Sequence, residues 1–165
     1  MNRLYLAGIL LALGTAGACT KAPVQEVATR GEIVRLSSVS APAANASAYG
    51  SAFNAFRAQK GLPQLRRSPR LEAAARKHAR DIANMGKLTH RGSDGSQISG
   101  RVKATGYPMR RVAENAAWTA QGFDRVLKIW EGSPPHRKNM LRRDVEEYGL
   151  AKSGPYWVLV VGQKR

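Results

Sequence analysis

Three short signatures decide the fold of this chain, and they are Leu88-Thr89-His90, Glu114-Asn115-Ala116-Ala117-Trp118 and Trp130-Glu131-Gly132-Ser133-Pro134-Pro135-His136-Arg137. They contain two of the three histidines and two glutamates, set among mostly small and apolar neighbours. A small domain that brings His90, Glu114 and His136 together would own one polar pocket, which is the predicted functional site. The third histidine, His78, lies on the apolar face of a helical pattern. It is predicted to be a hydrogen-bonded core residue rather than a ligand.

The spacing of apolar residues along the chain predicts both helices and strands. The clearest helix covers residues 69–85: Ser68 suits the N-cap, Pro69 suits the first position and Gly86 ends it. Further helices are expected at residues 47–60, 97–104 and 122–132, and strands at residues 112–118, 147–152 and 156–162. The apolar run 158–161 favours a central strand that is covered on both faces. The fold class is α+β, a three-layer α/β/α sandwich with a small antiparallel central sheet.

Composition narrows the classes of partner. The chain has 165 residues, 43% of them hydrophobic, which is enough for an ordinary globular core. Lys and Arg outnumber Asp and Glu 27 to 11, for a net charge of +16, so anionic lipid or cell-envelope polymers are the expected partners. No helix-turn-helix or aromatic stacking platform is visible, and nucleic acid is not expected as a partner. Composition does not indicate an oligomeric state.

The N-terminal segment resembles an export signal. Arg3 precedes an apolar run from Leu4 to Leu13, and Ala16-Gly17-Ala18-Cys19 resembles a bacterial lipobox. We therefore expect a signal peptide at residues 1–18, a flexible tether at 19–46 and one domain at 47–165. Cys19 would carry the lipid, and the protein would be exported and membrane-anchored, in the periplasm or on the outer surface. The alternative is an ordinary cleaved signal and a secreted soluble protein.

Taken together, these pieces resemble the CAP superfamily, the SCP-like domain of cysteine-rich secretory proteins, antigen 5 and plant pathogenesis-related proteins, and in particular its short bacterial branch. The resemblance covers about residues 50–163. Besides the three signatures, it rests on Phe53-Asn54-Ala55-Phe56-Arg57, Leu71 with Ala75 and Ala79, Arg101 with Gly106-Tyr107, Arg137-Lys138-Asn139-Met140-Leu141, Tyr148-Gly149-Leu150-Ala151 and Tyr156-Trp157. Because Cys19 is the only cysteine, the disulfides of the family have no counterpart here.

The resemblance implies a central cleft with two His and two Glu, in which some members bind a divalent metal through the histidines. His90, Glu114 and His136 match three of these positions, and His90 and His136 are the implied metal ligands, with zinc the expected ion. Ser133 stands where the animal and plant branch has its second Glu, and Glu131 is the nearest alternative. Asn115, Arg101 and Ser133 are expected to support the cleft.

Three functions are compatible with such a pocket. Two imidazoles and a carboxylate could hold zinc and an activated water, which would make a metal-dependent hydrolase acting on peptides or wall material. CAP members are also associated with binding lipids or envelope components, and a non-catalytic binding module is the favoured reading. The third hypothesis is structural: Glu114 hydrogen-bonds the two histidines only to organise the core loops.

The lipobox makes a first testable prediction. Mass spectrometry of the mature protein, expressed in a bacterium that processes lipoproteins, should find Cys19 as an acylated first residue. A Cys19→Ser variant should lose the modification and leave the membrane fraction, because each buried acyl methylene contributes roughly 0.8 kcal/mol to anchoring. An unmodified mature terminus would rule out the lipoprotein.

Overall fold

The computed structural model describes residues 41–165. The predicted signal peptide, Cys19 and most of the predicted tether lie outside these residues. The elements in chain order are α1 (Ala41–Gln59), β1 (Arg66–Arg67), α2 (Pro69–Met85), α3 (Ile98–Ala104), β2 (Met109–Trp118), α4 (Phe123–Gly132), α5 (Pro134–Met140), β3 (Glu147–Ser153) and β4 (Tyr156–Lys164). Within this part of the chain, no helix has both the length and the apolar character needed to cross a membrane.

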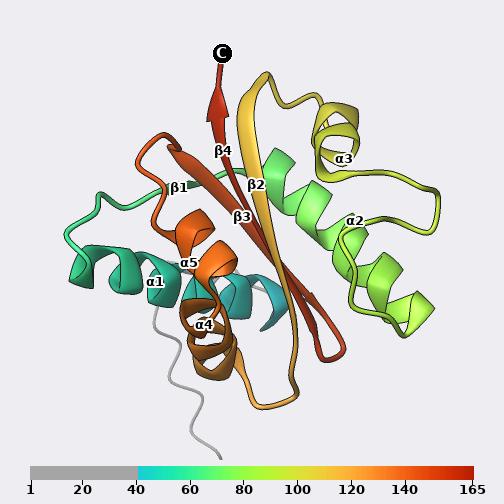
Figure 1. Ribbon diagram of the computed structural model, residues 1–165, viewed down its shortest axis with the longest axis horizontal. Helices are drawn as coiled ribbons and strands as arrows, with labels where there is room; N and C mark the ends of the chain where they lie inside the picture. Colours follow the sequence, from blue (N-terminus) through green and yellow to red (C-terminus); the bar gives the residue numbers. More distant parts are fainter. Residues whose placement is uncertain (1–40) are drawn as a thin grey trace, which may run out of the picture. The chain divides into compact units, whose positions relative to one another are not determined.

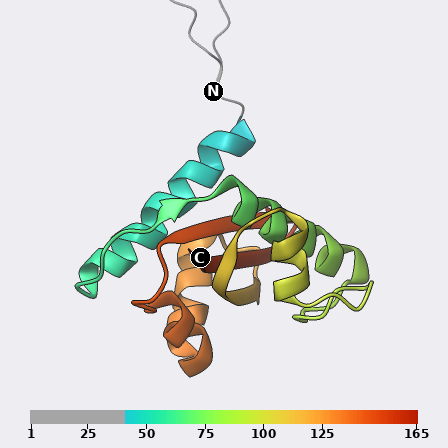
Figure 2. The same ribbon diagram turned by 90° about the horizontal axis from the view of Figure 1, so that it is seen from above.

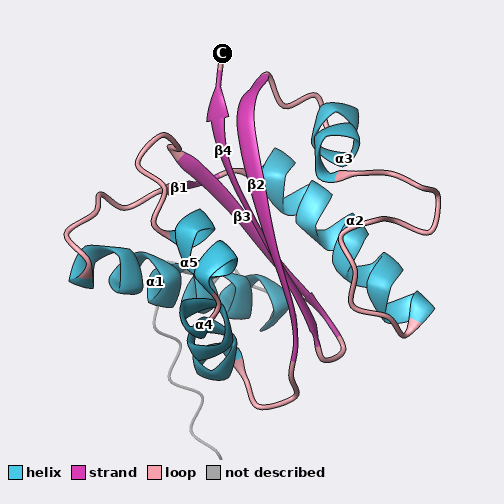
Figure 3. Ribbon diagram, in the orientation of Figure 1, coloured by secondary structure: helices cyan, strands magenta, loops and turns pink. Residues whose placement is uncertain are grey.

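The elements form three layers, as predicted for the α+β class. The strands lie in the order β1-β3-β4-β2, with α1, α4 and α5 on one face of the sheet and α2 and α3 on the other (Figures 1 and 3). Figure 2 shows the same sandwich along the sheet. The sheet is not purely antiparallel, however, because the two-residue strand β1 pairs with β3 in parallel. No sequence pattern indicated this strand, since two adjacent arginines have neither alternation nor apolar character.

Strand β4 is the centre of the core. It pairs with β2 on one side and β3 on the other, and its residues from Tyr156 to Gly162 are buried. One apolar cluster, which includes Phe53, Trp130 and Leu159, fills the space under α1 and α4. A second cluster, which includes Leu71 and Val160, fills the space under α2. The prediction of a central strand covered on both faces is confirmed.

Two helices differ from the expectation at their first residues. Helix α1 begins at Ala41 rather than at residue 47, because the alanine-rich stretch that starts it has high helix propensity even without an apolar period. Helix α5 begins at Pro134, whereas the sequence pattern predicts only a single turn at residues 139–141. Proline fits the first turn of a helix, since its missing N–H has no partner there in any case.

A buried arginine joins α1 to the end of α5. Arg57 is fully buried, and its guanidinium donates to the carbonyl oxygens of Pro63 (3.1 Å), Met140 (2.6 Å) and Arg142 (3.1 Å). Burial lowers the pKa of Arg57, and the nearby Arg143 adds to the effect. Three carbonyl dipoles therefore hold this cation in place, and they fix where the chain leaves α5.

Glycine 149 sets the closeness of α2 to the sheet. A Cβ at this β3 position would overlap the α2 backbone at Leu71 and Glu72. We predict that Gly149→Ala destabilises the domain by about 3 kcal/mol, since neither backbone can yield without moving the helix. The matched control is Gly100→Ala in α3, where nothing lies within 4 Å of the added Cβ. There the change should stabilise by about 0.5–1 kcal/mol. Urea unfolding of both variants measures the difference, and equal effects would contradict this account.

Candidate functional site

An ion pair between Glu114 and Arg101 forms the floor of the site. Glu114 lies in β2 on the face that looks towards α2 and α3, and its side chain is 3% exposed. Arg101 of α3, equally buried, donates from one nitrogen to both carboxylate oxygens, at 3.0 and 2.8 Å. The same guanidinium donates to the carbonyls of Ser96 (2.9 Å) and His90 (3.1 Å). One arginine therefore joins α3, β2 and the loop that carries His90.

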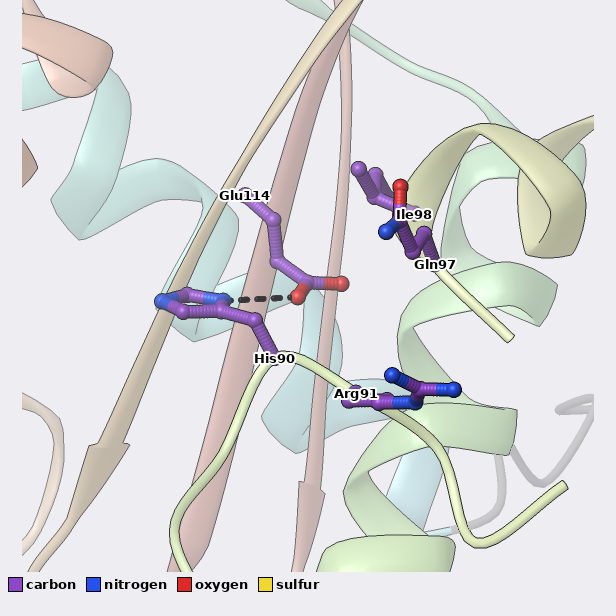
Figure 4. A pocket seen from close by; sticks show the side chains of 5 residues that line it. All are labelled: His90, Arg91, Gln97, Ile98 and Glu114. Atoms are coloured by element: carbon purple, nitrogen blue, oxygen red, sulfur yellow. Dashed lines mark hydrogen bonds and ion pairs between the residues drawn. The ribbon is translucent and has the colours of Figure 1, made fainter. Parts of the chain in front are cut away.

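His90 lies above this pair and faces the solvent. Its Nδ1–H donates to Oε1 of Glu114 at 2.9 Å, a contact drawn in Figure 4, while 60% of its side chain is exposed. The hydrogen bond to Glu114 raises the pKa of His90 above its ordinary value of 6.5, against the opposing effect of burial. The carboxylate thus fixes the ring by Nδ1 and leaves Nε2 for an outside group.

His78 lies close to the same carboxylate. It is fully buried in α2, and its Nε2–H donates to the carbonyl of Thr89 at 2.8 Å. Its Nε2 also lies 3.6 Å from Oε1 of Glu114, but burial lowers the pKa of His78, so the neutral ring is favoured and this contact is no ion pair. The expectation of a hydrogen-bonded core histidine agrees with this geometry. The bond to Thr89 also positions the residue next to His90.

His136 approaches from the opposite layer. Its ring centroid lies 6.4 Å from that of His90, and burial together with the charge of His90 lowers its pKa. Two asparagines hold the start of α5 against β2. Asn115 donates to the carbonyl of His136 (2.9 Å), and Asn139 donates to Oδ1 of Asn115 (3.0 Å) and to the carbonyl of Glu114 (3.2 Å). The structure therefore brings His90, Glu114 and His136 to one place.

A pocket of about 350 Å³ opens beside His90. It is lined by His90, Arg91, Gln97, Ile98 and Glu114 (Figure 4). Its outer loop is attached to α2, because Asp81 accepts hydrogen bonds from the backbone N–H (2.9 Å) and the hydroxyl (2.6 Å) of Ser93. This attachment holds the loop in a defined shape before any ligand binds.

One residue predicted for the cleft lies elsewhere. Glu131 forms an ion pair with Lys60 at 2.7 Å, on the layer of α1 and α4, and it does not line the pocket. One residue after Trp130 in a helix, it points away from the direction of the buried indole. Ser133 joins α4 to α5, and its side chain makes no capping hydrogen bond. The site thus has one carboxylate, not two.

The donor set does not fit a three-ligand zinc site. Both oxygens of Glu114 accept hydrogen bonds from Arg101, and one of them also accepts from His90. Glu114 consequently orients a histidine and does not itself face a shared point with the two rings. In residues 41–165, no three side chains of His, Cys, Asp and Glu are close enough to hold a metal. Among the described residues, the site offers two imidazoles as ligands, and Nδ1 of His136 is buried and unpartnered.

Sequence reasoning did not single out four residues of this site. Asn139 lies three positions after His136, so a helix starting at Pro134 would have placed both on neighbouring faces. Arg91, Gln97 and Ile98 line the pocket because the loop between them folds back on α2. The short polar residues of that loop indicated turns, but not which way the turns face.

The comparisons with known proteins agree with this architecture. The model of the CAP family, the cysteine-rich secretory protein family, matches residues 51–158. The chain belongs to this family. It is 27% identical over 106 residues to the protein YkwD of Bacillus subtilis, a match that covers 63% of this chain and 41% of YkwD.

Solved structures show the same fold. An extracellular SCP-domain protein of Bacillus anthracis superposes with a TM-score of 0.70 at 20% identity, covering 73% of this chain and 41% of that one. An outer surface protein of Borrelia burgdorferi gives a TM-score of 0.67 at 19% identity, covering 74% and 94%. At this identity the likeness establishes the fold and not the ligand.

The Glu114 network predicts an order of histidine pKa values. In an NMR titration, His90 should titrate above 6.5, and His78 and His136 below it. The stability that His90 contributes is then present below pH 6.5 and is lost as the pH rises through its raised folded-state pKa. Glu114→Gln should lower the pKa of His90. Finding His90 lowest of the three would contradict the network.

The same substitution should destabilise the domain by roughly 3–5 kcal/mol, because it leaves the buried Arg101 without a counter-charge. Glu131→Gln is the matched control. It breaks the half-exposed pair with Lys60 and should cost less than about 1 kcal/mol. If Glu114→Gln and Glu131→Gln lower the free energy of unfolding in urea by similar amounts, the Arg101–Glu114 pair stabilises the domain no more than the Lys60–Glu131 pair does.

Proposed function

We propose that this chain is a non-catalytic binding module whose His90 pocket takes an anionic group of a lipid or a cell-envelope polymer. The observation that carries this proposal is the complete engagement of Glu114 by Arg101 and His90. With its one carboxylate engaged by a guanidinium, the pocket offers the imidazole of His90 and the guanidinium of Arg91 to an incoming group. Cations around a pre-formed pocket favour an anion.

Hydrolysis has less support from the same geometry. A general base must be free to accept a proton, and Glu114 already accepts three hydrogen bonds. No serine, threonine or cysteine is among the residues that line the pocket, so it offers no nucleophile. The metal-dependent alternative needs a third ligand, which the donor set does not supply.

The proposed location is outside the cytoplasm. The export pattern of residues 1–19 supports it, as do the extracellular protein of Bacillus anthracis and the outer surface protein of Borrelia burgdorferi, which share the fold. Anchored at a lipid-modified Cys19, the domain would work at an envelope surface. The net charge of +16 would concentrate it at anionic lipid and polymer.

Glycerol 3-phosphate is a suitable probe, since it carries the phosphate group shared by anionic phospholipids and phosphate-containing wall polymers. In an NMR titration it should shift the resonances of His90 and Arg91. His90→Gln and Arg91→Gln should each weaken binding about tenfold, as loss of a charge-assisted hydrogen bond does. The matched control is Arg110→Gln, which removes an exposed charge from the start of β2, outside the pocket.

Two further arms of the experiment separate the sources of phosphate. If the chain binds glycerol 3-phosphate at least as tightly as it binds phosphatidylglycerol vesicles, the ligand is a soluble phosphate or a wall polymer. Tighter binding to the vesicles, lost in His90→Gln, would indicate a lipid headgroup. Equal affinity of the unsubstituted chain, His90→Gln and Arg91→Gln for both probes would reject the pocket as the anion site.

A further inference from the structure

Trp118 exposes a large apolar side chain from a rigid position. It is 56% exposed, whereas Trp130 and Trp157 are fully buried. It is the last residue of β2, and its backbone pairs with Tyr156 of β4. The indole is thus presented by a paired strand and not by a loose loop. Among residues 47–165, Leu88 is the only other large apolar side chain with comparable exposure, at 48%.

These two side chains lie towards the same end of the sandwich. Trp118 is next to the turn at Gly154 between β3 and β4, and Leu88 follows the end of α2. Figure 1 shows the end of β2, this turn and the end of α2 together along the lower side of the domain. A single exposed apolar residue needs no explanation, but two at the same end of the domain suggest a shared partner.

One exposed lysine precedes Leu88, and another lies near the turn between β3 and β4. Lys87 precedes Leu88 in the chain, and Lys152 of β3 is exposed beside the turn, with its Nζ 4.9 Å from the ring centre of Trp157. Indole rings favour the boundary between water and hydrocarbon, and lysine side chains favour anionic headgroups next to it. With a net charge of +16 on the chain, this combination fits an anionic bilayer better than an apolar protein surface.

The first turns of α1 lie at the same end of the domain. Tyr49 packs against Trp157 (ring centroids 5.0 Å apart), while Phe53, one turn later, packs against Tyr148 further from the turn. The N-terminal half of α1 therefore lies over the turn end of the sheet. Helix α1 begins at Ala41, so the described part of the chain starts at this end.

From these four observations we infer that the turn end of the domain, defined by Lys87, Leu88, Trp118 and Lys152, docks on an anionic phospholipid bilayer with Trp118 in the interface. This surface goes beyond the proposed function, because none of its residues lines the His90 pocket. Docking at this end would hold the domain by a second contact besides the expected lipid. Two weak membrane signals together give the stable attachment that either lacks alone.

The three tryptophans allow a direct test on the full chain. We use a Cys19→Ser background, so that no acyl chain can attach, and vesicles of phosphatidylglycerol or phosphatidylcholine. Trp118 fluorescence should shift to the blue on phosphatidylglycerol and be quenched by brominated lipid. Trp118→Phe supplies the background of the two buried tryptophans. Trp118→Ser should weaken vesicle binding about tenfold, because the apolar ring is lost from the interface.

A charge-matched pair tests the position of the surface. Lys87→Gln should weaken binding to phosphatidylglycerol more than Arg110→Gln, which removes one charge from the opposite end of the sheet. Circular dichroism melts of all variants show that the fold is kept, as expected for exposed positions. Binding with unchanged Trp118 emission would overturn the inference, since the membrane would then contact another part of the chain. Equal binding to both lipids, or equal effects of Lys87→Gln and Arg110→Gln, would overturn it as well.

Discussion

The buried pair of Arg101 and Glu114 is the constraint on which the rest of the site depends. Neither charge could stay in the interior alone, so α3, β2 and the loop before α3 have to meet. Once they meet, Arg101 also donates to the carbonyl oxygens of Ser96 and His90, and Oε1 of Glu114 also accepts from the His90 ring. A strong electrostatic requirement in the core thereby fixes an exposed imidazole at the surface.

This dependence explains which parts of the molecule could be predicted from the sequence. Helix α2 was predicted with its observed bounds, because its cap, its proline, its apolar face and its terminal glycine all agree. The central position of β4 followed from its unbroken apolar run. Local signals of this kind act within one element, and they need no knowledge of its neighbours.

The parts that could not be predicted depend on contacts between distant elements. Strand β1 exists only because Arg66 and Arg67 lie beside β3, and two residues carry no period of their own. The family resemblance led us to expect that His90, Glu114 and His136 converge and that Arg101 supports the cleft. It did not indicate that Arg101 of α3, thirteen residues before Glu114, pairs with both oxygens of its carboxylate. The engagement of Glu114 by that arginine, which removes it from the set of metal ligands, leaves no trace in spacing or composition.

The family takes its name from cysteines, yet the described domain has none. In this domain, distant segments are held together without disulfides. Arg57 donates to three carbonyl oxygens, and Arg101 pairs with Glu114. Thiol reagents, glutathione and disulfide isomerases consequently have nothing to act on between residues 41 and 165. No disulfide can form or break within these residues, whatever the redox potential of the compartment.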